Sequence, residues 1–551
     1  MRISIAQLNY HIGNFDKNKK LIIDSINTAR KEKADLIVFS ELSVCGYPPL
    51  DLLDHLDFIQ KCNIVVEEIA KECTDIAAII GSPTLNMKAE GKKLFNSALF
   101  LYQGKVLYQV NKALLPTYDI FDEYRYFEPE KEFKIIDFNS TRIALTICED
   151  LWDEQSFDNE FEKSKLYTIS PMEKLSGQNP DLVINISASP FSYTRIEGRT
   201  NIFRNKASKY NLPVITVNQV GASTELIFDG ASLVVNNEGK IFDRLPFFEE
   251  QIKTYELSDI NSGKTILVNN DYNTIELIYK ALTLAIRDYF RKMGFKNAIV
   301  GLSGGIDSAV TLCLAVEALG KKNVRALLLP SQYSSDHSVN DAVGLAKTLG
   351  VDYAIINIEK PFNAFERVLA SVFKAVKPDV TEENIQARIR AIILMAVSNK
   401  FGNILLNTSN KSEAAVGYGT LYGDMAGGIS VIGDVYKTDV YKLAKYINRN
   451  FEIIPTNSII KPPSAELRPD QLDTDSLPDY DSLDPILYQY IELKNSAEKI
   501  ISAGFDKQTV LKVIKLINNN EYKRYQAPPV LRISSKSFGA GRRMPLVAFY
   551  S

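Results

Sequence analysis

Residues 297–310, NAIVGLSGGIDSAV, join a short apolar run to a glycine-rich turn and to the start of an apolar helix. A glycine-rich turn between a strand and a helix directs backbone N–H groups and the positive helix end toward an anion. Ser303, Gly304 and Gly305 suit that task. The carboxylate of Asp307 is better suited to Mg²⁺, which bridges phosphate oxygens. The stretch therefore predicts a strand, a loop and a helix that bind nucleotide phosphates.

The sequence on either side of this loop continues the same pattern. Residues 324–330, VRALLLP, and 353–358, YAIINI, predict further strands. The helical stretches between the strands end in Gly320 and Gly350, and glycine commonly terminates a helix. Strands that alternate with helices in this way predict a doubly wound parallel sheet for the second half of the chain.

The first half of the chain is a separate α/β region. Eight short β-branched runs, from RISIAQL at residues 2–8 to PVITVNQ at 213–219, predict strands of a mixed, largely buried sheet. Glycine, asparagine and aspartate interrupt the pattern at residues 258–273. We therefore expect a first domain at 1–257, a linker at 258–273 and a second domain at 274–551.

The second half also contains a stretch rich in proline and aspartate, at residues 455–485. Its composition predicts a long surface loop. Such a loop is either a solvated connector or a lid over a site, and the sequence leaves both readings open.

Length and composition restrict the classes of function. A chain of 551 residues is too long for one core, and its 45% hydrophobic and 24% charged residues are typical of globular proteins. A net charge of -3 gives no electrostatic reason to expect nucleic acid or membrane partners. The sequence contains no long apolar run of the kind that predicts a signal peptide or a membrane span. Its five cysteines form no CxxC pair, which fits a reducing cytoplasm.

The motifs of the second half resemble a known family. SGGIDS after an apolar strand resembles the pyrophosphate-binding loop of the N-type ATP pyrophosphatases, which split ATP into AMP and pyrophosphate. With ENIQARIRA, NTSNKSEAAVGYGTLYGDMAGG, YKTDVYKLA, PPSAEL and SKSFGAGRRMP, it is similar to the NAD synthetase family. The resemblance implies an adenine nucleotide α-hydrolase-like fold with Mg²⁺, ATP and deamido-NAD as ligands.

The same resemblance assigns residues of the second half to each of these ligands. ATP is expected on Gly301, Leu302, Ser303, Gly304, Gly305, Ile306, Asp307, Ser308 and Thr408. Deamido-NAD is expected on Asn384, Glu413 and Lys536, and the metal on Asp307 and Glu413.

Three chemical groups in the first half lie where predicted strands end. Glu41 follows LIVFS, Lys112 follows YQVN, and Cys148 ends RIALTIC. Loops at the ends of neighbouring strands can converge on one rim of a sheet. Each residue alone has an ordinary alternative, since an isolated cysteine is usually a small core residue and an isolated glutamate or lysine is usually solvated.

Together these surroundings resemble the nitrilase superfamily, which hydrolyses amides with a Glu-Lys-Cys triad in an α-β-β-α sandwich. The resemblance implies that Glu41 accepts the thiol proton, Cys148 attacks the amide and Lys112 stabilises the oxyanion. A lysine beside the thiol is also expected to favour the thiolate. Resemblance to glutaminases of this superfamily implies glutamine contacts at Tyr118, Glu123, Ser189 and Arg195.

The two halves share ammonia, which an amidase releases and an amidating enzyme consumes. The combination resembles those NAD synthetases that carry a glutaminase domain, and the resemblance implies internal ammonia transfer and a homo-oligomer. Two alternatives remain open: amidation of a different carboxylate, and a nucleotide-binding sensor with inactive sites. The intact Glu41, Lys112, Cys148 and SGGIDS favour an enzyme.

Overall fold

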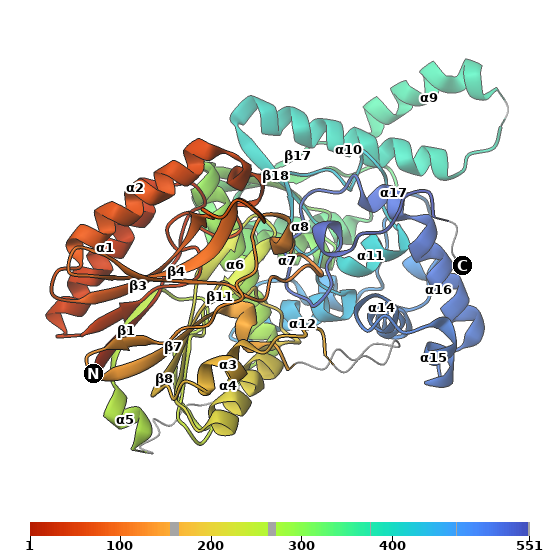
Figure 1. Cartoon of the computed structure of the whole chain (residues 1–551). Helices are drawn as coiled ribbons and strands as arrows, with labels where there is room; N and C mark the ends of the chain where they lie inside the picture. The colour runs from red at the N-terminus through yellow and green to blue at the C-terminus, as the bar shows by residue number, and fades with distance from the viewer. Residues whose placement is uncertain (155–164, 263–271, 375, 470, 549–551) are drawn as a thin grey trace. The chain divides into compact units, whose positions relative to one another are not determined.

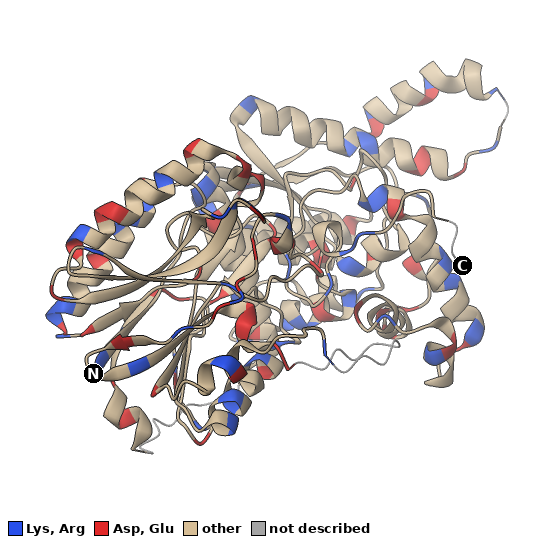
Figure 2. Cartoon of the chain, viewed as in Figure 1, with Lys and Arg blue, Asp and Glu red and all other residues tan. Residues whose placement is uncertain are grey.

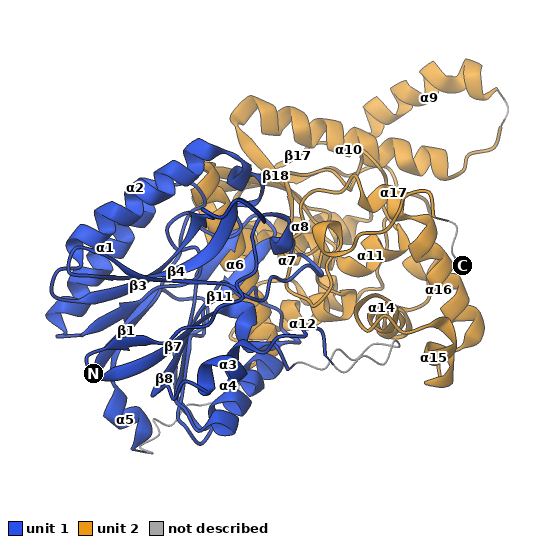
Figure 3. Ribbon diagram, viewed as in Figure 1, with its two compact units in different colours: residues 1–272 blue, residues 273–551 orange. Residues whose placement is uncertain are grey.

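The chain folds into two compact units, Met1–Tyr272 and Asn273–Ser551 (Figure 3). The computed structural model describes residues 1–154, 165–262, 272–374, 376–469 and 471–548. Of the predicted linker at 258–273, the first residues belong to the short helix α5 (Leu257–Asn261), and residues 263–271 lie outside the described residues.

The first unit contains two six-stranded sheets and a two-stranded ribbon (Figure 1). One sheet has the order β14 (Gln251–Glu256), β1 (Arg2–Gln7), β2 (Leu36–Val38), β3 (Ala77–Leu85), β4 (Leu94–Tyr102), β5 (Lys105–Asn111). The other has the order β13 (Ile241–Arg244), β12 (Leu233–Val235), β9 (Val214–Asn218), β8 (Leu182–Ser187), β7 (Thr141–Ile147), β6 (Ile136–Phe138). The ribbon pairs β10 (Val220–Ser223) with β11 (Leu226–Asp229).

Three apolar cores separate four layers of this unit. Residues such as Ile5 and Ile147 from the two sheets share one core. A second core joins the first sheet to α1 (Phe15–Lys31) and α2 (Leu56–Glu72). A third joins the second sheet to α3 (Pro171–Ser176) and α4 (Ile196–Tyr210). Side chains alternate across the strands, so each sheet contributes to a core on both of its faces, although the edge strand β5 is largely exposed. The predicted α-β-β-α sandwich is confirmed.

The second unit is built on a parallel five-stranded sheet. Its order is β17 (Asp352–Ile355), β16 (Val324–Leu328), β15 (Asn297–Gly301), β18 (Asn403–Asn407), β19 (Ile429–Ser430). Ile299 and Leu405 of the sheet share a core with Ile389 of α10 (Val380–Phe401) and Phe362 of α9 (Glu359–Phe373). Helices α6 (Thr274–Met293), α7 (Ile306–Leu319) and α12 (Lys437–Ile447) pack against one another. The predicted doubly wound sheet is confirmed.

A separate small core lies among α11 (Lys411–Val416), α14 (Tyr480–Leu487), α15 (Ala497–Ser502), α16 (Lys507–Asn519) and α17 (Glu521–Arg524). Helices α8 (Asp336–Leu349) and α13 (Thr456–Ile460) pack instead against α7 and against each other. Ala415 of α11, Leu483 of α14 and Val513 of α16 pack together in that core. Gly320 and Gly350 follow α7 and α8 with positive φ angles, as the sequence predicts.

The stretch 455–485 is more ordered than its composition predicts. It contains α13 and the first part of α14, so helices interrupt the predicted long surface loop. The Asp479 side chain caps α14 by accepting from the Ser482 N–H, and Leu483 is fully buried. Capping and burial therefore outweigh the presence of Pro485 within the helix.

Charged side chains of both signs are distributed over the helices of both units (Figure 2). This pattern agrees with the small net charge of the sequence. Among the described residues, no helix is both long and apolar enough to cross a bilayer.

Candidate active sites

Cys148 lies where β7 ends, as the first residue of a short 3-10 turn, Cys148–Leu151. Its φ of 41° is in the left-handed region, which a residue with a side chain adopts only when its surroundings enforce it. Asp150 supplies that enforcement, because its carboxylate accepts from the backbone N–H of Ile147 at 3.0 Å, Ala113 at 3.0 Å and Leu114 at 2.9 Å. Asp150 thus ties the cysteine turn to the residues that follow Lys112.

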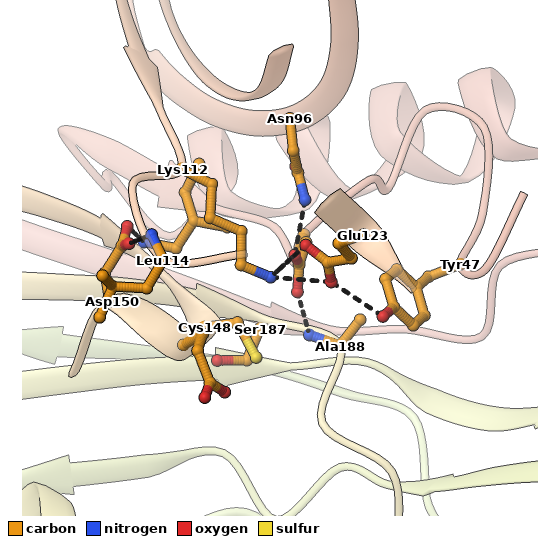
Figure 4. A network of polar contacts seen from close by, with 12 residues as sticks. Tyr47, Asn96, Lys112, Leu114, Glu123, Cys148, Asp150, Ser187 and Ala188 are labelled. Carbon is orange, nitrogen blue, oxygen red and sulfur yellow. Dashed lines mark hydrogen bonds and ion pairs between the residues drawn. The ribbon is translucent and has the colours of Figure 1, made fainter. Parts of the chain in front are cut away.

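Glu41 and Lys112 form the buried centre of the same site. Figure 4 shows the Lys112 side chain extending toward Glu123. Lys112 Nζ donates to Glu41 Oε1 at 2.7 Å. The other contacts of the Glu41 carboxylate come from Asn96 Nδ2 at 2.8 Å and the Ala188 backbone N–H at 3.0 Å. The carboxylate is therefore fixed by three donors from three parts of the chain. The structure brings together the three residues that the sequence predicts as a triad.

A second carboxylate balances the charge of Lys112. Lys112 Nζ lies 2.9 Å and 2.8 Å from the two oxygens of Glu123, which also accepts from the Tyr47 hydroxyl at 2.9 Å. Burial alone would lower the pKa of Lys112, but Glu123 and Glu41 raise it well above its usual range. Lys112 therefore stays charged, as the stabilisation of an oxyanion requires.

The thiol is in a different electrostatic state from the one expected. Burial raises the pKa of Cys148 well above its usual range, Glu41 raises it further, and Lys112 only partly offsets both. Lys112 acts in the predicted direction, because it lowers the pKa of the thiol, but burial and Glu41 outweigh it and the thiol stays neutral. A neutral thiol beside Glu41 is suited to attack with concerted proton transfer to that carboxylate.

The residues predicted to contact glutamine differ in their hydrogen-bond partners and in their exposure. The Tyr118 hydroxyl donates to Glu149 Oε1 at 2.8 Å, and so does the Tyr167 hydroxyl. The Ser189 N–H donates to Asn218 Oδ1 at 2.8 Å. Arg195 is exposed at the start of α4 and acts electrostatically on Tyr118. Glu123 is held on Lys112, and its contact with the glutamine amino group stays a prediction.

The glycine loop of the second unit joins β15 to α7, as predicted. Gly304 has φ +84°, and a Cβ there would lie 2.1 Å from the Ser338 carbonyl oxygen. Only glycine fits this close approach of two backbones. Ser303 and Ser308 brace the turn, since the Gly305 N–H donates to Ser303 Oγ at 3.2 Å and Ser308 Oγ donates to the Gly305 carbonyl at 3.0 Å.

A pocket of about 310 Å³ opens beside this loop at the carboxyl end of the parallel sheet. Its lining includes all but one of the residues predicted to bind ATP, the exception being Gly304: they are Gly301, Leu302, Ser303, Gly305, Ile306, Asp307, Ser308 and Thr408. Glu413 also lines the pocket, whereas Asn384 and Lys536 do not belong to its lining. Asn384 Oδ1 accepts from the Thr420 hydroxyl at 2.7 Å.

Two carboxylates of this pocket face one cation. Lys437 Nζ pairs with Asp307 and lies 3.4 Å from Glu413 Oε1, and Asn410 Nδ2 donates to Asp307 Oδ1 at 2.9 Å. Burial raises the pKa of Glu413 to about 8, Asp307 adds repulsion, and Lys437 partly offsets it. Two carboxyl groups beside a single lysine can accept a divalent cation, which would displace the proton of Glu413.

The donor set also fits Mg²⁺ in particular. Among the described residues, no group of three or more His, Cys, Asp or Glu could hold a metal ion alone. Mg²⁺ usually takes one or two carboxylates and completes its shell with water and phosphate oxygens. Asp307 and Glu413 supply two such carboxylates beside the glycine loop.

Two protein-family models divide the chain between them. Residues 2–263 match carbon-nitrogen hydrolase and residues 278–527 match NAD synthase. The chain is 44% identical to the glutamine-dependent NAD(+) synthetase of Synechocystis sp. over 99% of its own length and 98% of that protein's. It is 42% identical to the enzyme of the same name from Acinetobacter baylyi, with the same coverage. The chain belongs to the glutamine-dependent NAD synthetase family.

A solved structure of the glutamine-dependent NAD synthetase family agrees with this membership. The enzyme from Acinetobacter baumannii, determined in complex with ADP, has a TM-score of 0.78 and is 39% identical. The match covers 99% of this chain and 98% of that chain. The glutamine-dependent NAD synthetase of Cytophaga hutchinsonii has a TM-score of 0.81 at 21% identity, a likeness of fold alone. The predictions of family and of fold are confirmed.

Sequence reasoning missed several residues that the structure places in the two sites of this NAD synthetase family member. Glu149 and Asp150 directly follow Cys148, so their position next to the nucleophile was a usable signal. Asn96 lies within FNSALF, but nothing local points to Glu41, and Tyr47 likewise carries no local signal toward Glu123. Lys437 lies in YKTDVYKLA, where its pairing with Asp307 depends on the fold.

Proposed function

We propose that the chain makes NAD from deamido-NAD, ATP and glutamine, releasing AMP, pyrophosphate and glutamate. The observation that carries the proposal is the buried contact of 2.7 Å between Lys112 Nζ and Glu41 Oε1 beside Cys148, in a chain that also holds a glycine-loop nucleotide pocket. Similarity to glutamine-dependent NAD(+) synthetases over 99% of the chain supports the same reaction. In this proposal residues 1–257 form the glutaminase, 258–273 the linker and 274–551 the synthetase.

The glutaminase half-reaction uses the buried cluster of the first unit. Glu41 takes the thiol proton as Cys148 attacks the glutamine amide, and Lys112 stabilises the oxyanion. Ammonia leaves, and water activated by Glu41 hydrolyses the thioester. Tyr118, Glu123, Ser189 and Arg195 hold glutamine, with Arg195 supplying a cation for the α-carboxylate.

The synthetase half-reaction uses the pocket of the second unit. Backbone N–H groups of the loop 301–308 and the start of α7 grip the pyrophosphate of ATP, with Thr408 beside it. The nicotinate carboxylate of deamido-NAD, held by Asn384, Glu413 and Lys536, attacks the α-phosphorus and becomes adenylated. Ammonia then attacks the activated carboxyl carbon and displaces AMP, a better leaving group than hydroxide.

In this proposal Asp307 and Glu413 would hold Mg²⁺, which would supply positive charge beside the pyrophosphate. Lys437 contacts the same two carboxylates. In this proposal it stays beside the phosphates. A thermal-shift titration with ATP tests the assignment without turnover. We expect Mg²⁺ to raise the melting temperature of the ATP-bound protein and Asp307→Asn to remove that increase. An unchanged increase in the variant contradicts the assignment.

The reaction is tested by NAD formation from deamido-NAD, ATP and Mg²⁺ with glutamine or ammonium chloride as the nitrogen source. We expect NAD and AMP in equal amounts with either source. Glutamate release without NAD would retain the glutaminase and reject deamido-NAD as the acceptor, which points to a different carboxylate. Absence of both products rejects the enzyme assignment.

The proposal also includes a homo-oligomer in the cytoplasm. Helix α9 leaves most of its apolar residues exposed, with Val368 73% and Val372 69% exposed and Phe362 buried. A helix of this length is marginal alone in water, so a second copy of the chain is suited to cover it. Val368→Asp with Val372→Asp should lower the mass measured by sedimentation.

All five cysteines are free, as a reducing cytoplasm requires.

A further inference from the structure

A buried ionic cluster in the second unit is centred on Lys411, the first residue of α11. Lys411 Nζ lies 2.9 Å from Asp434 Oδ1 and 2.8 Å from Glu492 Oε1. It also donates to Ser534 Oγ at 2.8 Å and to the Lys536 carbonyl at 2.9 Å. One side chain therefore joins α11, the segment before α12, the turn after α14 and the C-terminal segment.

The two carboxylates of this cluster hold the same C-terminal segment. Asp434 Oδ2 accepts from the backbone N–H of Ile533 at 2.8 Å and of Ser534 at 2.7 Å. Asp434 Oδ1 accepts from the Ser534 hydroxyl at 2.8 Å, and Glu492 Oε2 accepts from the Ser535 hydroxyl at 2.5 Å. Residues 533–536 belong to no helix or strand, so side chains and not a ladder fix their path.

Helix α11 connects this cluster to the nucleotide pocket. Glu413 lies two residues after Lys411, and residues two apart on a helix point in different directions. Glu413 lines the pocket, while Lys411 is fully buried in the cluster. Two residues of one short helix are therefore involved: Glu413 lies on the wall of the pocket, and Lys411 holds the segment that ends in Lys536.

Stability alone is a weak explanation for such a cluster. Taking three charged groups out of water carries a large desolvation cost, and well-packed apolar side chains often stabilise as well. Charged hydrogen bonds, however, fix distances and directions that apolar packing leaves adjustable. A site that must hold a dinucleotide between Glu413 and Lys536 benefits from that geometric restraint.

We propose that Lys411 is a positioning residue that sets the Lys536 segment relative to Glu413 and thereby sets the affinity of the synthetase site for deamido-NAD. This inference rests on the proposed function, since it takes Glu413 and Lys536 as deamido-NAD ligands. It assigns no contact with substrate to Lys411 itself. Its effect is therefore expected in the KM for one substrate and not in the chemistry.

The test compares wild type, Lys411→Met and Ser534→Ala in NAD formation with ammonium chloride. We expect the KM for deamido-NAD to rise roughly tenfold or more in Lys411→Met, and about threefold to tenfold in Ser534→Ala, which removes one hydroxyl from the cluster. The KM for ATP and glutamate release from glutamine should change by less than about twofold. Ser534→Ala decides the matter if Lys411→Met does not fold.

Asp288→Asn is the matched control, because Asp288 is a buried carboxylate of α6 that pairs with Arg291 at 2.8 Å and is not part of the pocket lining. It should lower the melting temperature without a selective effect on deamido-NAD. Equal increases in the KM for ATP and for deamido-NAD, an unchanged KM in Ser534→Ala, or the same selective increase in Asp288→Asn each overturn the inference. Wild type that makes no NAD instead rejects the proposed function.

Discussion

In the first unit Lys112 lies between Glu41 and Glu123 with none of its side chain exposed, whereas in the second unit Lys437 lies between Asp307 and Glu413 on the wall of a pocket of about 310 Å³. Both arrangements place one ammonium group against two carboxylates. The first is closed to water. The second faces a space that a metal ion and phosphates can enter.

This difference indicates how each site is prepared for its reaction. In the proposed function the buried cluster needs only glutamine, because hydrogen bonds already fix Glu41 and Lys112 and Asp150 fixes the turn of Cys148. Burial raises the pKa of Glu413 in the pocket to about 8, so this carboxyl keeps its proton near neutral pH until a cation displaces it. One site is therefore complete within the fold, and the other is completed by its ligands.

The largest expected effect separates the two sites completely. Cys148→Ala removes the nucleophile and should lower glutamine-supported NAD synthesis by at least about 10³-fold, because no other group can form the thioester. Ammonia-supported synthesis should stay within about twofold of wild type. The measurement is NAD formation with each nitrogen source in turn. Loss of both activities in a folded variant contradicts independent sites.

The reverse separation uses the glycine loop. Gly304→Ala puts a Cβ 2.1 Å from the Ser338 carbonyl oxygen and should lower synthesis with either nitrogen source by roughly 10²-fold, since the loop must shift away from the phosphates. Glutamate release should persist.

Gly294→Ala is the control for that variant, because Gly294 also has a positive φ, +76°, but a Cβ there meets no atom within 4 Å. Both substitutions carry the backbone cost of about 1 kcal/mol, and only one of them clashes. A similar loss of synthesis in both variants attributes the effect to stability.

A pH profile of glutamate release sharpens the comparison further. Burial raises the pKa of Glu123 to about 7, so this carboxyl is protonated below that pH and ionised above it. When Glu123 is protonated, Glu41 is the only ionised carboxylate on Lys112. Glu41 then accepts the thiol proton less readily. We therefore expect kcat/KM for glutamine to rise roughly tenfold between about pH 6 and about pH 8. The acidic limb should disappear from the residual activity of Glu123→Gln; a limb that persists there assigns it to another group.

The smallest expected effect concerns the outer contact of the buried cluster. Tyr47→Phe removes the hydroxyl that donates to Glu123 Oε1 at 2.9 Å and keeps the ring. The loss of one buried hydrogen bond, about 1 kcal/mol, should lower kcat/KM for glutamine about fivefold. Synthesis with ammonia should be unchanged. No change in glutamate release shows that Lys112 and Asn96 already fix the carboxylates.

The sequence predicted most of the fold because its patterns are local. The strand before the glycine loop, the helix after it and the helix ends at Gly320 and Gly350 depend on neighbouring residues. The order in the stretch 455–485 was not predicted, because burial of Leu483 against distant helices decides it. Amino-acid composition indicates which segments are solvated, but it does not indicate which side chains distant helices bury.

The sequence by itself determined the chemical groups of both sites: Glu41, Lys112 and Cys148 after strands, and the loop 301–308 before a helix. Only the tertiary structure decided their electrostatic states. Burial and Glu41 outweigh Lys112 and keep the Cys148 thiol neutral, and Lys437 pairs with Asp307 although 130 positions separate them. Local patterns follow from backbone geometry, whereas charge balance depends on burial and on distances between residues that only folding brings together.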